Sequence, residues 1–226
     1  MNNEMKKGSD AVFEKFGTYI LPGRVSDPRR GIDEAKEAER IGLGAVWISE
    51  RYASKEPAVL SGAVSEATSK IRIAGTFYVT MRNPIVTASV GDIMQQMSGD
   101  RFRILLAKAV PQYLATLGSP PINFARLADA ISLYRRLWAG ETVNYEGILG
   151  KFPHLVLTDR SGGTPPPIIY TAIGPKSLAF AGTHCDGVLL HPFVSIEGVK
   201  RSANIVRDAA EKAGRDVIEI MDGYNA

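Results

Sequence analysis

The feature that most constrains the fold of this chain is the regular alternation of short apolar segments with longer segments of helical spacing. From Phe16 onward, the short segments are rich in β-branched and aromatic residues. Such alternation is typical of a parallel sheet whose strands are joined by helices. The predicted strands are 16–21, 45–49, 71–80, 102–107, 167–171, 187–190 and 217–220. We therefore expect an α/β fold.

Cap and turn residues mark the helices between these strands. Asp27-Pro28 and Asn83-Pro84 each combine a polar cap residue with proline, a pattern that starts helices. The predicted helices are 28–41, 56–68, 84–98, 175–183 and 197–213. A further helix carries four apolar residues on one face, which predicts packing on the sheet. These residues are Leu127, Ile131, Tyr134 and Trp138. Segment 142–157 then reads as a hairpin insertion.

Two parallel architectures are compatible with this order: the doubly wound open sheet and the eight-stranded barrel. Gly42-Leu43-Gly44 follows a helix and precedes a strand, the reverse of the order in a dinucleotide-binding fingerprint. A (β/α)8 barrel needs about 250 residues, and the chain has 226. We expect a single domain over residues 1–226, a (β/α)8 TIM-barrel type that lacks its C-terminal closing elements.

Composition excludes several classes of protein. The chain has 27 basic and 24 acidic residues and no basic tract, which argues against nucleic-acid binding. The single cysteine, Cys185, allows no internal disulfide, and a reducing cytoplasm is the expected location. No apolar run is long enough to span a bilayer, so we expect no membrane association. No cluster has the spacing of metal ligands, and we expect no metal site.

Candidate site residues follow the strands, because parallel α/β folds place their sites at the carboxyl ends of the strands. Glu50 and Arg51 follow the second strand and could either steer a ligand or form a surface ion pair. The turn 172–175 leads into a helix, where backbone N–H groups could bind a phosphate; a plain turn is the alternative. His191 follows the sixth strand and could shuttle a proton or only bond its own loop.

Several segments, in this order, resemble the luciferase-like monooxygenase superfamily of flavin- or deazaflavin-dependent oxidoreductases. They are 42–51 (GLGAVWISER), 67–73 (ATSKIRI), 82–84 (RNP), 97–102 (MSGDRF), 133–141 (LYRRLWAGE), 143–147 (VNYEG), 166–175 (PPIIYTAIGP) and 185–188 (CDGV). The resemblance covers about residues 16–220. It implies a barrel that binds a reduced tricyclic cofactor at the carboxyl ends of its strands.

The resemblance also implies roles for particular residues. Ala172, Ile173, Gly174 and Pro175 match the turn that holds the cofactor phosphate. Phe77-Tyr78 matches a third-strand bulge with a non-proline cis peptide behind the ring. Glu50 matches an acidic residue near the pyrimidine end of the ring, and Arg51 stands where many relatives have histidine. The sequence pattern most resembles that of the deazaflavin branch, which uses coenzyme F-420 for hydride transfer.

Two departures from the family pattern shape the functional hypotheses. A glycine-rich turn after the fourth strand is replaced by Ala107-Lys108-Ala109-Val110, and we place Lys108 and Ala109 among the cofactor contacts. An unclosed barrel would expose two strand edges, which favours a homodimer or higher assembly. The first hypothesis is F-420-dependent hydride transfer to or from a small organic substrate, with Glu50 and His191 as catalytic residues. The alternatives are an FMN-dependent monooxygenase and a catalytically silent flavin-binding or assembly protein.

Overall fold

The computed structural model describes Glu14 and residues 16–23, 26–51, 54–158, 160, 162–216 and 219–222. Its main sheet contains seven strands, all parallel, in the order β1-β2-β3-β4-β7-β8-β9. They are β1 (Gly17–Tyr19), β2 (Ala45–Ile48), β3 (Arg72–Phe77), β4 (Phe102–Leu106), β7 (Ile168–Ala172), β8 (Gly187–Leu190) and β9 (Glu219–Asp222). The predicted parallel α/β fold is confirmed.

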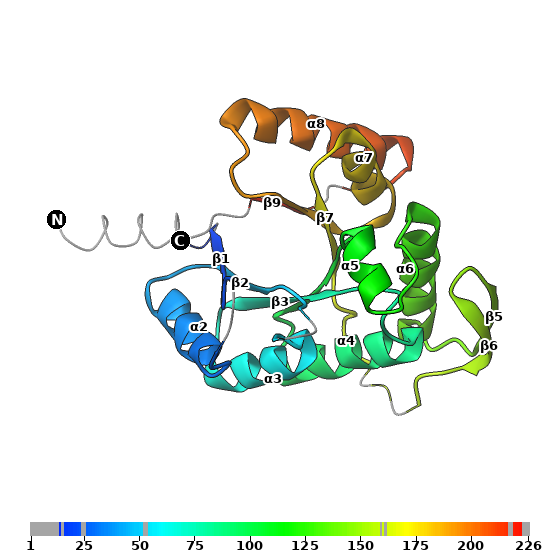
Figure 1. Ribbon diagram of the computed structural model, residues 1–226, viewed down its shortest axis with the longest axis horizontal. Helices are drawn as coiled ribbons and strands as arrows, with labels where there is room; N and C mark the ends of the chain where they lie inside the picture. The colour runs from blue at the N-terminus through cyan, green and yellow to red at the C-terminus, as the bar shows by residue number, and fades with distance from the viewer. Residues whose placement is uncertain are drawn as a thin grey trace.

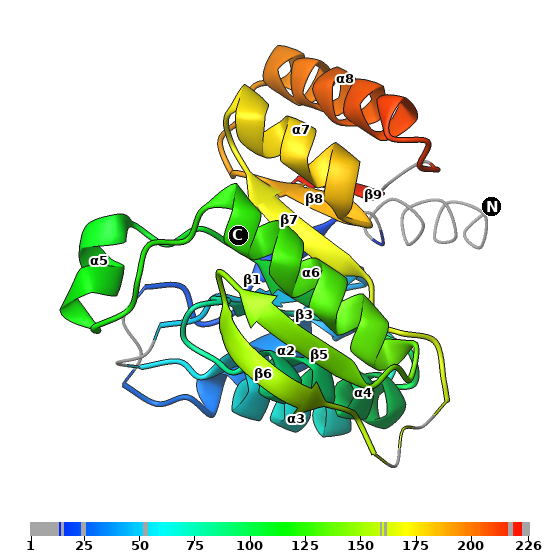
Figure 2. The same cartoon turned by 90° about the vertical axis from the view of Figure 1, so that its right-hand side faces the viewer.

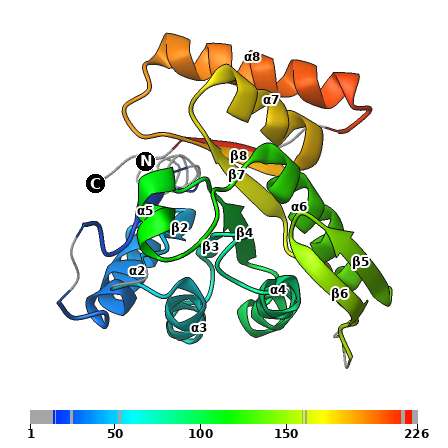
Figure 3. The ribbon, with the colours of Figure 1, turned by 45° about the vertical axis from the view of Figure 1, so that its right-hand side comes forward.

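Helices cover the outer face of this sheet. They are α2 (Arg30–Arg40), α3 (Pro57–Ala67), α4 (Pro84–Ser98), α6 (Phe124–Trp138), α7 (Pro175–His184) and α8 (Ile196–Lys212). The short helix α5 (Pro111–Thr116) lies in the connection between β4 and α6, apart from this layer. Helices α2, α3 and α4 lie on one side of the molecule and α7 with α8 on the other (Figure 1). The antiparallel hairpin of β5 (Val143–Gly147) and β6 (Gly150–Leu155) lies beside α6 (Figure 2). Seen from a third direction, the helices form an arc around the strands (Figure 3).

The sheet is curled, so that its inner face has a small core of its own. Alternate residues of successive strands meet there, because side chains alternate between the faces of a strand. The members of this inner core are Ala45, Trp47, Ala74, Leu105, Ile169 and Leu189, with Tyr19 and Met221 packed against them. A larger core lies between the outer face and the helices, and all four residues of the predicted apolar face of α6 are buried in it.

An ion pair ties together two strands that are far apart in the sheet order. Arg72 of β3 donates from Nη1 to Oε1 of Glu219 on β9 at 2.7 Å. Burial lowers the pKa of Arg103 on β4, and the charge of Glu219 opposes this shift. Strands β3 and β9 can share this pair only if the sheet curls on itself. The architecture is therefore a curled half-barrel of seven strands, as expected for a TIM-barrel type fold.

Element boundaries differ from the predictions where side chains form tertiary contacts or local bonds. Asn83 caps α4 as predicted, accepting from Ile85 N at 3.1 Å. Asp27 does not cap α2: its carboxylate binds the backbone and the guanidinium of Arg29, and the helix begins at Arg30. Helix α5 was not predicted. Strands β1 and β3 are shorter than predicted, and the start of the predicted last strand, 217–218, lies outside the described residues.

The crossing of α7 and α8 offers a test of packing. A Cβ on Gly182 of α7 would lie 2.3 Å from the carbonyl oxygen of Val206 on α8, so Gly182→Ala should force the helices apart. We expect a loss of about 1–3 kcal/mol in the free energy of unfolding. In α3, a Cβ on Gly62 would meet nothing within 4 Å, and Gly62→Ala should add about 0.5–1 kcal/mol. Urea unfolding measures both, and a stable Gly182→Ala variant would contradict the close packing.

Within the part of the chain that the structure describes, none of the helices has both the length and the hydrophobicity needed to cross a membrane.

Candidate functional site

A cavity of about 300 Å³ opens at the carboxyl ends of the strands. Its lining comes from six strand ends, which is where a parallel barrel presents its site. The lining residues are Tyr19, Ser49, Thr76, Tyr78, Ala107, Lys108, Tyr170, Thr171, Ala172, Ile173, Ser177, Leu189, Leu190, His191 and Pro192. Of the predicted site residues, the cavity brings together Tyr78, Lys108, Ala172, Ile173 and His191. Glu50, Arg51, Phe77, Ala109, Gly174 and Pro175 lie outside this lining.

The predicted phosphate turn leads directly into a helix. Strand β7 ends at Ala172, and α7 begins at Pro175 with Gly174 as its N-cap. Gly174 supplies no capping side chain. The first amide groups of a helix have no partner within that helix, and they lie at the positive end of its dipole. Lys176 and Ser177 stand in the first turn of α7, and Ser177 lines the cavity.

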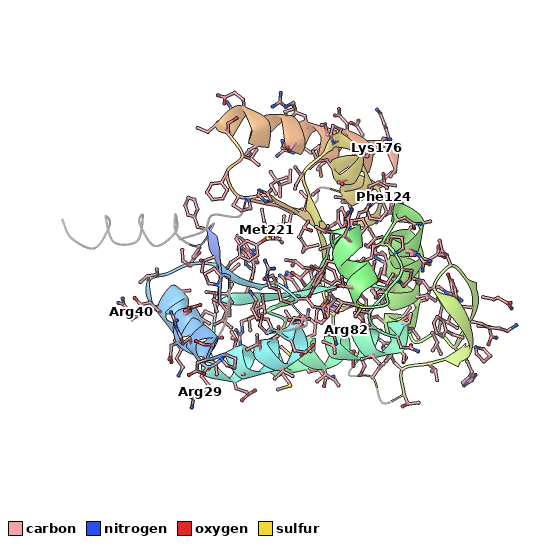
Figure 4. The ribbon with its side chains drawn as sticks, in the orientation of Figure 1. Arg29, Arg40, Arg82, Phe124, Lys176 and Met221 are labelled. Carbon is pink, nitrogen blue, oxygen red and sulfur yellow. The ribbon has the colours of Figure 1, made fainter. Side chains whose placement is uncertain are left out.

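Lys108 places a positive charge at the same side of the cavity. Its Nζ lies over the ring of Phe124, 4.1 Å from the ring centroid. Phe124 stacks on Phe180 of α7, with ring centroids 5.0 Å apart. The Phe124 and Lys176 side chains both lie on the α5, α6 and α7 side of the molecule (Figure 4). Lys108 is exposed, and this cation–π contact with the aromatic stack orients its ammonium beside the cavity.

Glu50 is buried, with 1% of its surface exposed, and is held by hydrogen bonds. Its Oε2 accepts from the backbone N–H of Tyr78 at 2.8 Å, and its Oε1 accepts from Arg82 Nη2 at 2.7 Å. Arg82 also pairs with Glu56 and lies over the Phe77 ring, 5.2 Å from its centroid. Sequence proximity suggested an ion pair between Glu50 and Arg51; the buried partner is instead Arg82, on the loop after β3.

Phe77 and Tyr78 mark the end of β3. The expected cis peptide between them is not present: no cis peptide bond occurs among the described residues. Phe77 is fully buried and pairs in register with Leu106 of β4, so the extended strand continues to this residue. Burial raises the pKa of the Tyr78 hydroxyl, as does the charge of Glu50. Tyr78 therefore keeps its hydroxyl proton where it lines the cavity.

The hydrogen bond of His191 defines its tautomer. Its Nδ1 lies 2.6 Å from the carbonyl oxygen of Pro192. A carbonyl oxygen only accepts, so Nδ1 donates a proton to it, and in the neutral form of the ring the lone pair lies on Nε2. The sequence suggested two roles for His191, a hydrogen bond to its own loop and proton transfer. The two roles are compatible, because one ring nitrogen bonds the loop while the other remains available.

Several lining residues were not predicted from the sequence. Tyr19, Ser49, Thr76 and Thr171 are the polar residues among them that come from the ends of strands. They share a signal, because each falls on the inward-facing positions of its strand, in phase with the inner core residues. Extending the two-residue period by one step beyond Trp47, Ala74 and Ile169 would have identified Ser49, Thr76 and Thr171.

No group of three or more His, Cys, Asp or Glu side chains suited to a metal ion is found in the described part of the chain. Cys185 is fully buried, and burial raises the pKa of its thiol to about 12.

The Cys185 thiol gives a test in alkaline solution. In the unfolded chain a thiol ionises near pH 8.5, so above that pH the unfolded state loses a proton that the native state keeps. The contribution of the buried thiol to the free energy of unfolding is fully present below pH 8.5 and is lost as the pH rises toward 12. We expect wild type to lose about 2 kcal/mol relative to Cys185→Ala between pH 7.5 and 10. Urea unfolding of both proteins measures this difference, and equal losses would contradict it.

The chain is similar to a known protein family and to several characterised oxidoreductases. Residues 11–221 match the family model described as luciferase-like monooxygenase. The 5,10-methylenetetrahydromethanopterin reductase of Methanolobus tindarius is 31% identical over 214 residues, which cover 91% of this chain and 62% of that protein. An F-420-dependent glucose-6-phosphate dehydrogenase of Amycolatopsis mediterranei is 29% identical over 250 aligned positions, covering 98% of this chain and 70% of that protein.

Solved structures show the same fold. The coenzyme F-420 dependent tetrahydromethanopterin reductase of Methanopyrus kandleri aligns with a TM-score of 0.78 and 22% identity, over 93% of this chain and 65% of that one. The oxygenating constituent of 3,6-diketocamphane monooxygenase from Pseudomonas putida, in complex with FMN, aligns with a TM-score of 0.77 and 21% identity, over 90% and 64%. The match of the family model to residues 11–221, on a curled parallel sheet with its cavity at the strand ends, shows that the chain belongs to the luciferase-like monooxygenase family.

Proposed function

We propose that this protein is an oxidoreductase that transfers a hydride between the deazaflavin coenzyme F-420 and a small organic substrate. The observation that carries the proposal is the cavity at the strand ends, which joins the uncapped turn of α7 to Lys108 and His191. The names of two similar proteins, a methylenetetrahydromethanopterin reductase and an F-420-dependent dehydrogenase, support this chemistry.

The residues present fit a phosphate-bearing tricyclic cofactor. The α7 turn, residues 172–175, and the Lys108 ammonium supply positive partners for a phosphate. A cavity of about 300 Å³ lies at the lower end of the range for small-molecule sites, which suits the ring system with the tail outside. Tyr78 would contact the ring from the end of β3. We place Ala109 and Arg51 at the rim, beside Lys108 and Tyr78.

His191 is the residue we assign to proton transfer. Its Nε2 can accept the hydroxyl proton of an alcohol substrate, or return it as the imidazolium. The bound cofactor would supply or accept the hydride. Glu50 is assigned a positioning role, because its Oε2 holds the Tyr78 N–H and thereby fixes the end of β3 behind the cavity.

An FMN-dependent monooxygenase is the second candidate function. The fold shared with the FMN-containing monooxygenase constituent of Pseudomonas putida favours it, because the same cavity and turn suit either cofactor.

We also propose a homodimer in which the outer strands of the described sheet, β1 and β9, contact a second copy, since such edges have unpaired backbone groups. A dimeric binding protein without catalytic activity is the third candidate.

An absorbance titration of the purified protein with coenzyme F-420 and with FMN, alongside size-exclusion chromatography, tests the proposal. Saturable binding of F-420 with weaker binding of FMN is the expected result. Preference for FMN, together with oxygen uptake when reduced FMN and substrate are supplied, would favour the monooxygenase. A folded protein that binds neither cofactor would contradict both enzymatic assignments.

A further inference from the structure

We propose that Ser49, oriented by the buried Lys55 ammonium, donates a hydrogen bond into the cavity and selects ligands that present a carbonyl or carboxylate oxygen to that wall. The inference deepens the proposed function, on which it rests for the role of the cavity as the reaction site. It concerns the β2 side of the cavity, across the sheet from the α7 turn and Lys108.

Lys55 is a buried cation with defined partners. Only 3% of its surface is exposed, although lysine is almost never fully buried without partners. The backbone of Lys55 pairs with that of Arg51, which folds the loop after β2 back on itself. Its Nζ donates to the carbonyl oxygen of Leu21 at 2.7 Å and to Ser49 Oγ at 2.9 Å. The ammonium thus joins the loop after β1 to the end of β2.

The charged groups around Lys55 act on its ammonium in opposite directions. Burial lowers the pKa of Lys55, as does Arg51, while Glu34 of α2 opposes the shift. Glu34 is fixed close to this network, because its Oε2 accepts from the N–H of Leu21 at 2.6 Å. The Leu21 carbonyl oxygen can only accept, so Lys55 must donate to it. The network therefore links Glu34, the backbone of Leu21, the Lys55 ammonium and the Ser49 hydroxyl in a chain of hydrogen bonds.

This arrangement assigns the proton of Ser49. A serine hydroxyl has one proton and two lone pairs, and Oγ uses a lone pair to accept from Lys55. Its own proton is therefore directed to a different acceptor. Ser49 lines the cavity, so a ligand in the cavity can supply that acceptor. A hydroxyl that accepts from an ammonium is also a stronger donor, because hydrogen bonds in a chain polarise one another.

The rest of the cavity wall has the same polarity. Ser49 follows Ile48, which pairs in register with Gly75, so Thr76 lies beside it on β3. Tyr19 on the other side stays protonated, because burial raises the pKa of its hydroxyl. Among the described residues that line the cavity, none is Asp or Glu, while Lys108 is a cation. An oxygen with partial or full negative charge suits this wall, and an ammonium group does not.

The test uses small probes that need no cofactor. Acetate carries only acceptor oxygens, and ethylammonium carries only donors. Both are titrated at constant ionic strength into the nitrogen-15 labelled full chain, and amide shifts at Ser49, Thr76 and Leu189 report the cavity. We expect saturable acetate binding that is about tenfold weaker in Ser49→Ala and largely retained in Ser49→Thr, which keeps the hydroxyl. Ethylammonium should leave these amides unchanged.

Lys55→Met separates a positioning role from a general effect of charge. If Lys55 acts through Ser49, its removal should weaken acetate binding less in the Ser49→Ala background than in wild type. The control is Lys70→Met, which removes an exposed lysine from the loop before β3, at the opposite end of the sheet. If Lys55→Met does not fold, the two Ser49 variants carry the test.

Three results would overturn the inference: absence of acetate shifts at these amides, equal acetate binding by Ser49→Ala and wild type, or binding of ethylammonium at the same amides. Failure of the F-420 and FMN titration leaves this test intact, because acetate binding does not depend on the cofactor. The two proposals can therefore fail independently.

Discussion

Gly174→Asp is expected to abolish binding of a phosphate-bearing cofactor while leaving the protein folded. Gly174 has φ −93°, and an added Cβ would meet nothing within 4 Å, so the backbone accepts a side chain there. Aspartate is a favourable N-cap, which should keep or increase the stability of α7. Its charge would repel a phosphate by about 4 kcal/mol at 4 Å separation, which corresponds to roughly a thousandfold loss of affinity.

Gly174→Asn is the matched control for this prediction. Asparagine has the same size and the same capping ability as aspartate but no charge. We expect it to bind the cofactor within about tenfold of wild type, since it adds only a side chain at the rim. Absorbance titrations with F-420 and FMN give the dissociation constants, and thermal unfolding checks the fold. Equal cofactor affinity of the aspartate and asparagine variants would show that the α7 turn does not bind the phosphate.

Glu50→Ala is expected to lower the free energy of unfolding by about 3–5 kcal/mol, the cost of removing one partner from a buried ion pair. The change leaves the Arg82 guanidinium, whose side chain is 16% exposed, without its buried carboxylate. It also leaves the N–H of Tyr78 without the acceptor that Oε2 provides. Because Tyr78 lines the cavity, we expect weaker cofactor binding in the same variant.

Glu56→Gln serves as the control, because Glu56 pairs with the same arginine from an exposed position. Glutamine retains an oxygen to cap α3, as Glu56 does by accepting from Val59 N at 2.7 Å. We expect a loss of less than about 1 kcal/mol, the usual value for exposed pairs. Urea unfolding of the two variants and wild type makes the comparison. Similar unfolding midpoints for Glu50→Ala and wild type would show that Glu50 does not hold this part of the fold.

The position of Glu50 shows where sequence reasoning stopped. The residues 49–51 were recognised as the end of a strand, because that depends on the local pattern of apolar and polar residues. The partner of Glu50 was not, because Arg82 is 32 residues away and reaches it only once β2 and β3 are paired. Lys55 was missed for the same reason, since its contact with Leu21 spans 34 residues.

The sequence by itself determined the alternation of strands and helices, the cap of α4 at Asn83 and the bounds of β8, since short-range periodicity and backbone capping specify such elements. It also placed the turn 172–175 before a helix. Only the tertiary structure decided which side chains share the cavity, because the curl of the sheet brings together the ends of strands that are distant in sequence. The donor role proposed for Ser49 depends in turn on the Lys55 ammonium, which the fold places between Ser49 and the backbone of Leu21.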